Sequence, residues 1–416
     1  MKKQLYSTAL FITALVSLLL SPTPGRSAEN TRSEPDVKHL YQEERYEEII
    51  QTVEGKETPD PRESLYLGLS YLRMGDQKRA IIAWQQYVQA NPGNEGSREV
   101  SKYLTLLLQE EAKRTAREIL QQEKQLTGKI DSKAIAVSPF QNLGQQTYTP
   151  LSKGLAEMII TDLSKVKTLK VVERIQLKAL LDELKLSQSG LVDTQSAPRV
   201  GKLLGAGKIT TGSFLDLEQE KLRLDASVTQ TENGKLITNP EVHGALPSFY
   251  QMEKEMVFKI LCGIGSCPES LDSQTRAAVG AIHTRNFKAF RLYSQGLEYL
   301  DQVKYREASR SFFLAVEEDP EFELARKALL DTPLFPLDLQ AMISGAESIG
   351  DGGRLLAAGT LYAPQVPEPL SGNRVMAPGL GMLTPPAHQA LSPGLGVLTP
   401  PTVPSNTVPV QVHVQF

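Results

Sequence analysis

The feature that most constrains this 416-residue chain is a spaced pattern of small and aromatic residues that occurs twice, 228 residues apart. Both copies place a glycine, a tyrosine, an alanine, a large aromatic residue and a proline at the same intervals. The first copy comprises Leu67, Gly68, Tyr71, Ala80, Trp84 and Pro92, and the second comprises Gly296, Tyr299, Ala308, Phe312 and Pro320. Small residues let two helices approach closely, and the proline ends the second helix. Each copy therefore predicts a helical hairpin.

The two hairpins resemble tetratricopeptide repeats, which are helical units of about 34 residues. One period before the first copy, Tyr46 and Ile50 align with Ala80 and Trp84, which favours a degenerate repeat there. Further along, the leucine-rich stretch 97–126 contains no proline and is expected to form a long helix that covers the open end of this block. Repeats of this kind rarely stand alone, so the second hairpin is expected to pack against neighbouring helices.

A surface for protein partners is what the tetratricopeptide resemblance implies. Such hairpins usually present the first helix of each pair to ligands, which in the first copy is the face around Glu63, Tyr66, Ser70 and Arg73. We therefore expect this face to bind partner proteins. The residues that pack the repeat are structural whether or not a partner binds.

Between the two helical segments, the pattern changes to short apolar runs that alternate with helices. Residues 134–137 and 169–172 predict buried strands, and 151–166 predicts an amphipathic helix between them. Residues 222–229 alternate apolar and polar side chains, which predicts a strand with one buried face, and the Asn-Gly pair at 233–234 predicts a tight turn after it. We therefore predict an α/β domain at the centre of the chain.

Four short runs in this central region carry a family resemblance. They are Val171-Val172-Glu173-Arg174, Ser187-Gln188-Ser189-Gly190-Leu191-Val192-Asp193, Gly201-Lys202-Leu203-Leu204-Gly205-Ala206 and Thr211-Gly212-Ser213. In this order and spacing they resemble the core of the curli-secretion channel family, the CsgG-like proteins. The resemblance implies a non-enzymatic protein of the outer-membrane-bounded periplasmic space. It also implies a role in assembling or secreting surface structures, with envelope proteins as partners and oligomerisation through the α/β domain.

The sequence also departs from the pore-forming members of that family. Those members are lipoproteins, and they insert long hairpins between their later strands. The corresponding connections expected here are only 218–221 and 239–248. A strand that spans a membrane needs about 9 to 11 residues and a hairpin needs two such strands, so these connections of four and ten residues are too short to cross. The sequence therefore favours a scaffold or accessory factor with at most peripheral membrane association, and an outer-membrane secretion pore subunit is the alternative.

The N-terminus has the pattern of a secretory signal peptide over residues 1–28. Lys2 and Lys3 precede an apolar run at 9–20, and small residues suitable for cleavage follow at 27–28. This run is shorter than the roughly 20 residues that span a bilayer. We therefore expect export to the periplasm, which is an oxidising compartment.

Two cysteines, Cys262 and Cys267, are the only ones in the chain. The four residues between them do not fit the Cys-x-x-Cys redox motif, so we predict a structural disulfide, with two reduced thiols as the alternative. The five histidines include no pair at i, i+4 spacing, and no catalytic, metal or cofactor site is predicted. A net charge of −3 and a pI near 6.1 argue against nucleic-acid binding.

A glycine-rich segment at 201–208 looks at first like a phosphate-binding loop. It has one residue too many between its outer glycines, and Ile209 stands where a serine or threonine would hold magnesium. We predict instead a helix that ends at Gly205 and a turn at Gly207 into a strand.

The C-terminal 85 residues hold 13 of the 26 prolines and only six charged residues, and we expect no core there. Their last residues alternate valine with other residues up to Phe416, which favours addition to a partner's sheet edge. The predicted fold class is thus α+β. The predicted segments are a signal peptide (1–28), a tetratricopeptide-like helical domain (33–126), a CsgG-like α/β sandwich domain (130–267), a second helical segment (274–331) and a disordered Pro/Gly-rich tail (332–416).

Overall fold

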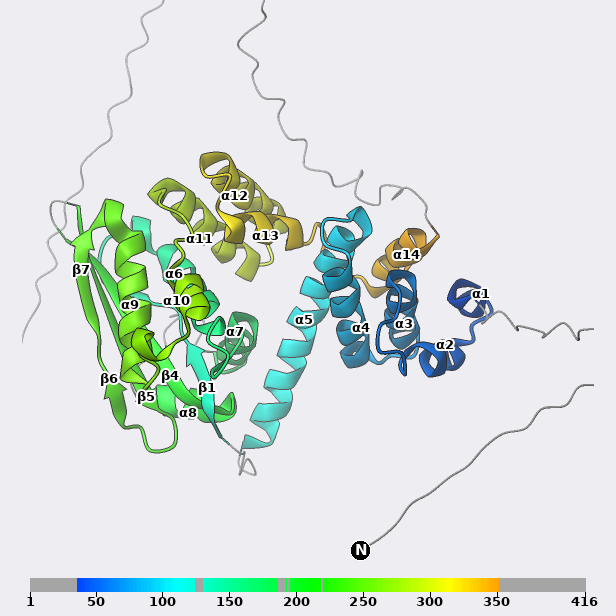
Figure 1. Ribbon diagram of the computed structural model, residues 1–416, viewed down its shortest axis with the longest axis horizontal. Helices are drawn as coiled ribbons and strands as arrows, with labels where there is room; N and C mark the ends of the chain where they lie inside the picture. Colours follow the sequence, from blue (N-terminus) through cyan, green and yellow to red (C-terminus); the bar gives the residue numbers. More distant parts are fainter. Residues whose placement is uncertain (1–35, 124–129, 186–191, 193–194, 218–219, 352–416) are drawn as a thin grey trace, which may run out of the picture. The chain divides into compact units, whose positions relative to one another are not determined.

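The computed structural model describes residues 36–123, 130–185, 192, 195–217 and 220–351 (Figure 1). These residues all belong to one of two compact units, Met1–Pro364. The predicted signal peptide, the proline-rich repeats of the tail and the alternating residues before Phe416 lie outside the described residues. The described part is a mixed α+β fold, which confirms the predicted fold class.

Five helices of the described chain form the N-terminal block. The first two lie where the degenerate repeat was expected, the next two where the hairpin was expected, and the fifth where the covering helix was expected. The helices are α1 (Val37–Gln42), α2 (Tyr46–Val53), α3 (Pro61–Arg73), α4 (Gln77–Ala90) and α5 (Glu95–Gln121). Local sequence sets their starts, because Asp60, Asp76 and Asn94 each accept a hydrogen bond from a first-turn amide. At α3 the cap is a full capping box, since Glu63 also accepts from the Asp60 amide.

A seven-stranded sheet forms the centre of the described chain, with strand order β3-β1-β4-β5-β6. The pairs β3–β1 and β1–β4 are parallel, and the β4–β5 and β5–β6 pairs are antiparallel. Two further strands lie off this path, because β2 pairs with β4 and β7 pairs with β5. The strands are β1 (Asp131–Val137), β2 (Gln141–Asn142), β3 (Lys170–Val171), β4 (Ala206–Leu217), β5 (Lys221–Gln230), β6 (Leu236–Thr238) and β7 (Glu241–Ala245).

Successive side chains of β1 enter two different cores, as the two-residue period of a strand requires. Ile135 and Val137 pack under α6 (Leu151–Ser164) and α9 (Phe249–Gly263). The intervening alanines of β1 pack with α7 (Arg174–Glu183), α8 (Ala197–Leu203) and part of α5. In β5 the alternation expected for 222–229 is present, with Leu222, Leu224, Ala226 and Val228 buried.

One expected connection is wrong. The segment 239–248 was predicted to be a loop, but Glu241–Ala245 forms β7 and pairs along β5 from Lys221 to Asp225. Val242 is the single buried hydrophobic residue of β7. The strand forms because β5 offers a free row of backbone groups, which the local pattern of β7 does not reveal.

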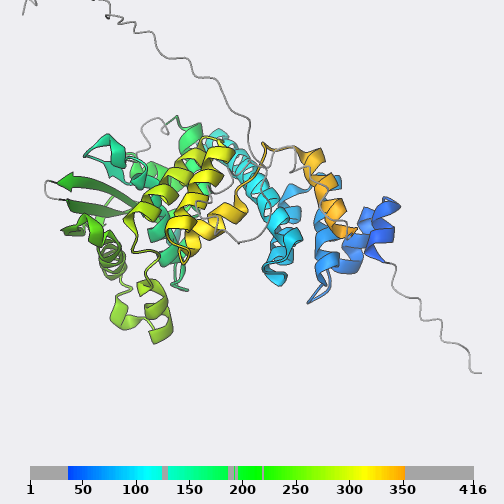
Figure 2. The same cartoon turned by 90° about the horizontal axis from the view of Figure 1, so that it is seen from above.

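Between α9 and the last described helix lie α10 (Ser273–Gly280), α11 (Phe287–Asp301), α12 (Tyr305–Glu318) and α13 (Glu323–Asp331). Their apolar side chains belong to the same core as α6, α9 and one face of the sheet. Figure 2 shows α11 to α13, in yellow, against the green and teal central region. The second helical segment is therefore a layer of the central domain and does not form a core of its own.

A second correction concerns the predicted tail. Residues from 332 on were expected to build no core, yet Leu339–Gly350 forms helix α14. Met342, Ile343 and Ala346 are buried in the core of the N-terminal block. The sequence of α14 looks like a tail because it is rich in glycine and serine, and its helical state depends on this packing.

Candidate functional site

The interiors of the two hairpins are built alike. In the first hairpin (α3–α4), a Cβ placed on Gly68 would lie 2.1 Å from Cδ1 of Trp84, so only glycine fits there. The Trp84 indole donates a hydrogen bond to the Leu65 carbonyl (3.1 Å). In the second hairpin (α11–α12), a Cβ on Gly296 would lie 2.4 Å from Cε1 of Phe312.

The remaining pattern residues occupy corresponding places. Ala80 and Ala308 are fully buried at the helix crossings, and α4 and α12 end just before Pro92 and Pro320. Tyr71 is buried, whereas Tyr299 is partly buried against the core. The shared spacing thus corresponds to shared packing.

The face expected to bind partners is not open. Tyr66 and Ser70 are buried, and the Ser70 hydroxyl donates to the Tyr66 carbonyl (2.8 Å). Glu63 takes part in the α3 capping box and pairs with Lys56 (2.7 Å). Helix α14 of the same chain packs against α3. Partner binding at these residues stays a prediction.

Charged and hydroxyl groups fasten α14 to α1 and α3. Glu347 Oε1 accepts hydrogen bonds from the Tyr41 hydroxyl (2.7 Å) and from Arg73 Nη2 (2.7 Å). Asp351 lies 2.9 Å from Lys38 Nζ, and it accepts a longer bond from the Tyr66 hydroxyl (3.3 Å). Burial, and after it the charge of Asp351, raises the pKa of Tyr66 to about 12. We call Tyr66, Ser70 and Arg73 the docking face of the first hairpin.

The second hairpin docks a helix with the corresponding face. Superposing Gly68 on Gly296 in sequence aligns Tyr66, Ser70 and Arg73 with Ser294, Glu298 and Asp301. The helix docked there is α6. The charge at the last of these positions is thus reversed between the two hairpins.

On the second hairpin, the docked helix α6 contributes a cation and a glycine. Lys153 Nζ lies 2.9 Å from Glu298 and 2.8 Å from Asp301. Gly154 allows the close approach, because a Cβ there would lie 1.9 Å from the Ser294 hydroxyl. In the same way, a Cβ on Gly350 of α14 would lie 2.7 Å from the Tyr66 hydroxyl.

Asp301 is the most buried charge of this second interface. It also accepts from Arg174 Nη1 (2.8 Å) at the start of α7, and its side chain is 8% exposed. Burial would raise the pKa of Asp301, but the charges of Arg174 and Lys153 outweigh it and hold that pKa below its usual range. The sequence analysis missed this cluster, although the alignment of Arg73 with Asp301 was a signal that could have located it.

A second buried cluster joins α6 to α9 and to the segment before α11. Asp162 is fully buried and pairs with Lys254, with Lys165 (2.7 Å) and with His283 Nε2 (2.9 Å). Burial would raise the pKa of Asp162, but these three neighbours outweigh it and lower that pKa to about 2. Burial also lowers the pKa of His283, against the effect of the Asp162 charge.

Glu253 lies beside this cluster without a hydrogen bond to either carboxyl oxygen. Lys254 Nζ is 3.2 Å from its Oε2, but the contact lacks the alignment of a hydrogen bond. Burial first, and the nearby charge of Asp162 second, raise the pKa of Glu253 well above its usual value. Glu253 is therefore a carboxyl group that the fold favours in the protonated form.

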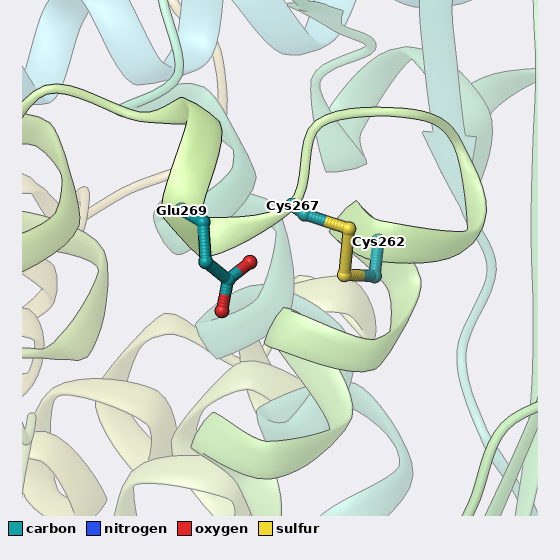
Figure 3. Close-up of side chains that lie close together, drawn as sticks. All are labelled: Cys262, Cys267 and Glu269. Atoms are coloured by element: carbon teal, nitrogen blue, oxygen red, sulfur yellow. A yellow bond between two sulfur atoms is a disulfide. The ribbon is translucent and has the colours of Figure 1, made fainter.

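Cys262 and Cys267 are joined by a disulfide at the end of α9 (Figure 3). The two sulfurs and a carboxylate oxygen of Glu269 lie within 4.8 Å of one another. A metal would need thiolate ligands, and both sulfurs are held in the disulfide bond. This trio is therefore not a metal centre.

The glycine-rich segment 201–208 connects a helix to a strand. Helix α8 ends at Leu203, Gly205 has a φ of +66°, and β4 begins at Ala206. A phosphate-binding loop requires the opposite order, from a strand into a helix. A Cβ on Gly207 would lie 2.6 Å from the Asp131 carbonyl, so this glycine serves the approach of β4 to β1.

Residues 113–227 match the family model described as "Curli production assembly/transport component CsgG". The centre of the chain is therefore similar to the CsgG family. The match begins within α5 and ends within β5, so it includes β1, α6, β3, α7, α8 and β4. It confirms the resemblance drawn from the sequence, and it adds residues 113–121 at the end of α5, which the predicted boundary at 130 left out.

A solved structure, the LpoB C-terminal domain from Salmonella enterica, aligns with 16% identity and a TM-score of 0.23, covering 31% of this chain and 94% of that chain. No curated protein matches the sequence. Among the described helices, none combines the length and apolar character needed to cross a membrane.

Proposed function

We propose that this protein is an exported, non-catalytic accessory or scaffold protein of the cell envelope, acting in the assembly or secretion of surface structures of the curli type. The observation that carries the proposal is the CsgG family match over residues 113–227. The family is described as a component of curli production, assembly and transport. The matched residues build the parallel half of the sheet with its flanking helices.

The arrangement of charged groups supports a non-catalytic role. Asp301 and Asp162 each pair with cations from other helices, so these clusters fasten helices together. Such pairs define how α6, α7, α9 and α11 pack, which is the requirement of a scaffold. In this proposal, partners meet the helical layers, and the sheet holds those layers in place.

Deletion of the gene in its own host tests the proposal. We expect surface-exposed polymeric protein, released by brief protease treatment of intact cells, to fall severalfold while its precursors accumulate inside the envelope. Expression of the wild-type chain should restore the surface protein. Unchanged surface protein and unchanged precursor levels would contradict the proposal.

The alternative is a secretion pore subunit, and it makes a different prediction. The β4–β5 connection holds three residues between Leu217 and Lys221, of which Glu220 is described. Purified mature protein added to planar bilayers should therefore give no stepwise conductance. Stepwise conductance together with carbonate-resistant membrane association would favour the pore subunit over the scaffold.

A further inference from the structure

We propose that α14 is a displaceable occupant of the docking face of the first hairpin, and that this face binds a partner helix of the same chemistry. That helix would have an apolar side with small residues at the points of closest approach. It would also carry a carboxylate that reaches Arg73 and Tyr41. The presence of such a partner rests on the proposed function, whereas the exchange of α14 does not.

The apolar side of α14 defines the shape that the face accepts. Met342, Ile343 and Ala346 are buried. Between them, a Cβ on Gly345 would lie 2.0 Å from the Tyr103 hydroxyl of α5, and Gly350 meets the Tyr66 hydroxyl in a similar way. A competing helix must therefore be small at two positions, five residues apart, that face these tyrosines.

The charges define the polarity of the ligand. Arg73, Lys38 and the Tyr41 hydroxyl all direct hydrogen atoms toward α14, and the groups that receive them are the carboxylates of Glu347 and Asp351. A helix with a basic residue in place of Glu347 would bring a cation against Arg73. The face thus selects an acidic helix end.

Two features make α14 displaceable. Its 12 residues include two glycines and two serines, which have low helix propensity, so the helix depends on its contacts. Its ion pair is open to solvent, with Arg73 and Glu347 each 31% exposed, whereas Asp301 at the matching position is 8% exposed. Exposed pairs of this kind hold two elements together weakly.

The chain itself keeps α14 close to its site. Only residues 332–338 separate α13 from α14, so the effective concentration of α14 at the face is high. A free helix of equal affinity therefore competes poorly with α14 in the intact chain. It binds well once α14 is prevented from docking.

A labelled peptide of residues 338–351 tests the proposal on the full-length chain. Gly345→Leu in the chain should expel its own α14, because the new side chain meets Tyr103. We expect the peptide to bind this variant at least tenfold more tightly than it binds the wild-type chain. The same peptide carrying Gly345→Leu should not bind.

Reversing the charge at residue 73 tests whether the peptide binds with its Glu347 against Arg73. Adding Arg73→Glu to the Gly345→Leu chain should weaken peptide binding about fivefold, and a Glu347→Arg peptide should recover it. Arg98→Glu, at an exposed position of α5, should leave binding unchanged.

Two results would overturn the proposal. One is absence of peptide binding to a Gly345→Leu chain whose α3–α5 amides remain protected from hydrogen exchange. The other is loss of that protection in the Gly345→Leu chain, because α14 would then be an integral part of the block. Neither measurement involves surface secretion, so failure here leaves the proposed function standing, and failure of the host experiment leaves this proposal standing.

Discussion

The two hairpins share an interior and differ in what covers them. In both, a glycine faces an aromatic ring across the helix pair, and the same face of the first helix receives a docked helix with a glycine at the point of contact. The second hairpin receives α6, a helix of the region that matches the CsgG family model, and its contact is part of the central core. The first receives α14, from the far end of the described chain.

In our proposal, the same repeat pattern serves a permanent contact in the second hairpin and an exchangeable contact in the first. At the matching position, Asp301 is almost enclosed and bound by two cations, and Arg73 is partly open to solvent. The free energy of an ion pair depends strongly on that enclosure, because a partner left alone in a buried site cannot be solvated. The pattern residues specify the hairpin, and the docked helix specifies its use.

The largest expected effect comes from breaking the two matched ion pairs. Asp301→Ala leaves Arg174 and Lys153 without their shared carboxylate and should lower the free energy of unfolding by about 4 kcal/mol. Arg73→Ala should lower it by less than about 1 kcal/mol, because its pair is exposed. Chemical denaturation of both variants measures the contrast, and equal losses would remove the distinction between the two contacts.

The hairpin interiors should respond equally. Gly68→Ala and Gly296→Ala each force a Cβ into an aromatic ring, and we expect each to cost about 2 to 3 kcal/mol. Gly55→Ala is the matched control, since a Cβ there meets nothing within 4 Å, and its effect should stay within about 0.5 kcal/mol. Unequal costs at Gly68 and Gly296 would show that the shared pattern hides different packing.

The covalent tie of the central domain has no counterpart in the N-terminal block, because the chain has no other cysteine. Reduction of Cys262–Cys267 should destabilise the central domain by about 2 kcal/mol on loop-entropy grounds. Hydrogen exchange should quicken in α9 and not in α3. Thiol labelling of denatured, unreduced protein should find no free cysteine, and full labelling of both would refute the pairing.

Glu253→Gln tests the buried charges around α6 through pH. The folded-state pKa of Glu253 is raised, so its stabilising contribution is present below its unfolded pKa near 4.5 and is lost as pH rises toward the folded pKa. Glutamine does not ionise, so the variant does not lose stability in this way as pH rises. The variant should therefore gain stability relative to wild type as pH rises.

Melting temperatures from pH 5 to pH 8 measure this gain. Lys254→Met offers a contrast, because it removes a cation from Asp162 and should destabilise the fold. A constant difference between wild type and Glu253→Gln across this range would mean that Glu253 is not protonated in the fold.

Much of the fold was predictable because its signals are local. The spacing around Gly68 and Gly296, the alternation in 222–229 and the helix end at Gly205 each depend on residues close in sequence, and the structure has these features. The predictions that failed concern elements that form only through tertiary contacts. Strand β7 exists because β5 offers an edge, and α14 exists because α3 and α5 offer a groove, so neither is encoded strongly in its own residues.

The candidate site shows the same division. The repeat pattern placed Arg73 on the face of the first helix that is predicted to bind partners. It could not show that Glu347, far along the chain, reaches Arg73, because a glycine-rich helix without its groove has the composition of a linker. The Asp162 cluster was hidden for a related reason, since its members come from three separate segments.

Hydrogen exchange on the unmodified full-length protein tests most directly whether the two docked helices differ. We expect amides of α14 to exchange about 100-fold faster than those of α6, through a local opening that leaves α3, α4 and α5 protected and depends little on denaturant. Amides of α6 should exchange only when the central domain unfolds. Equal protection of α14 and α6, lost together with that of α3, would contradict the account.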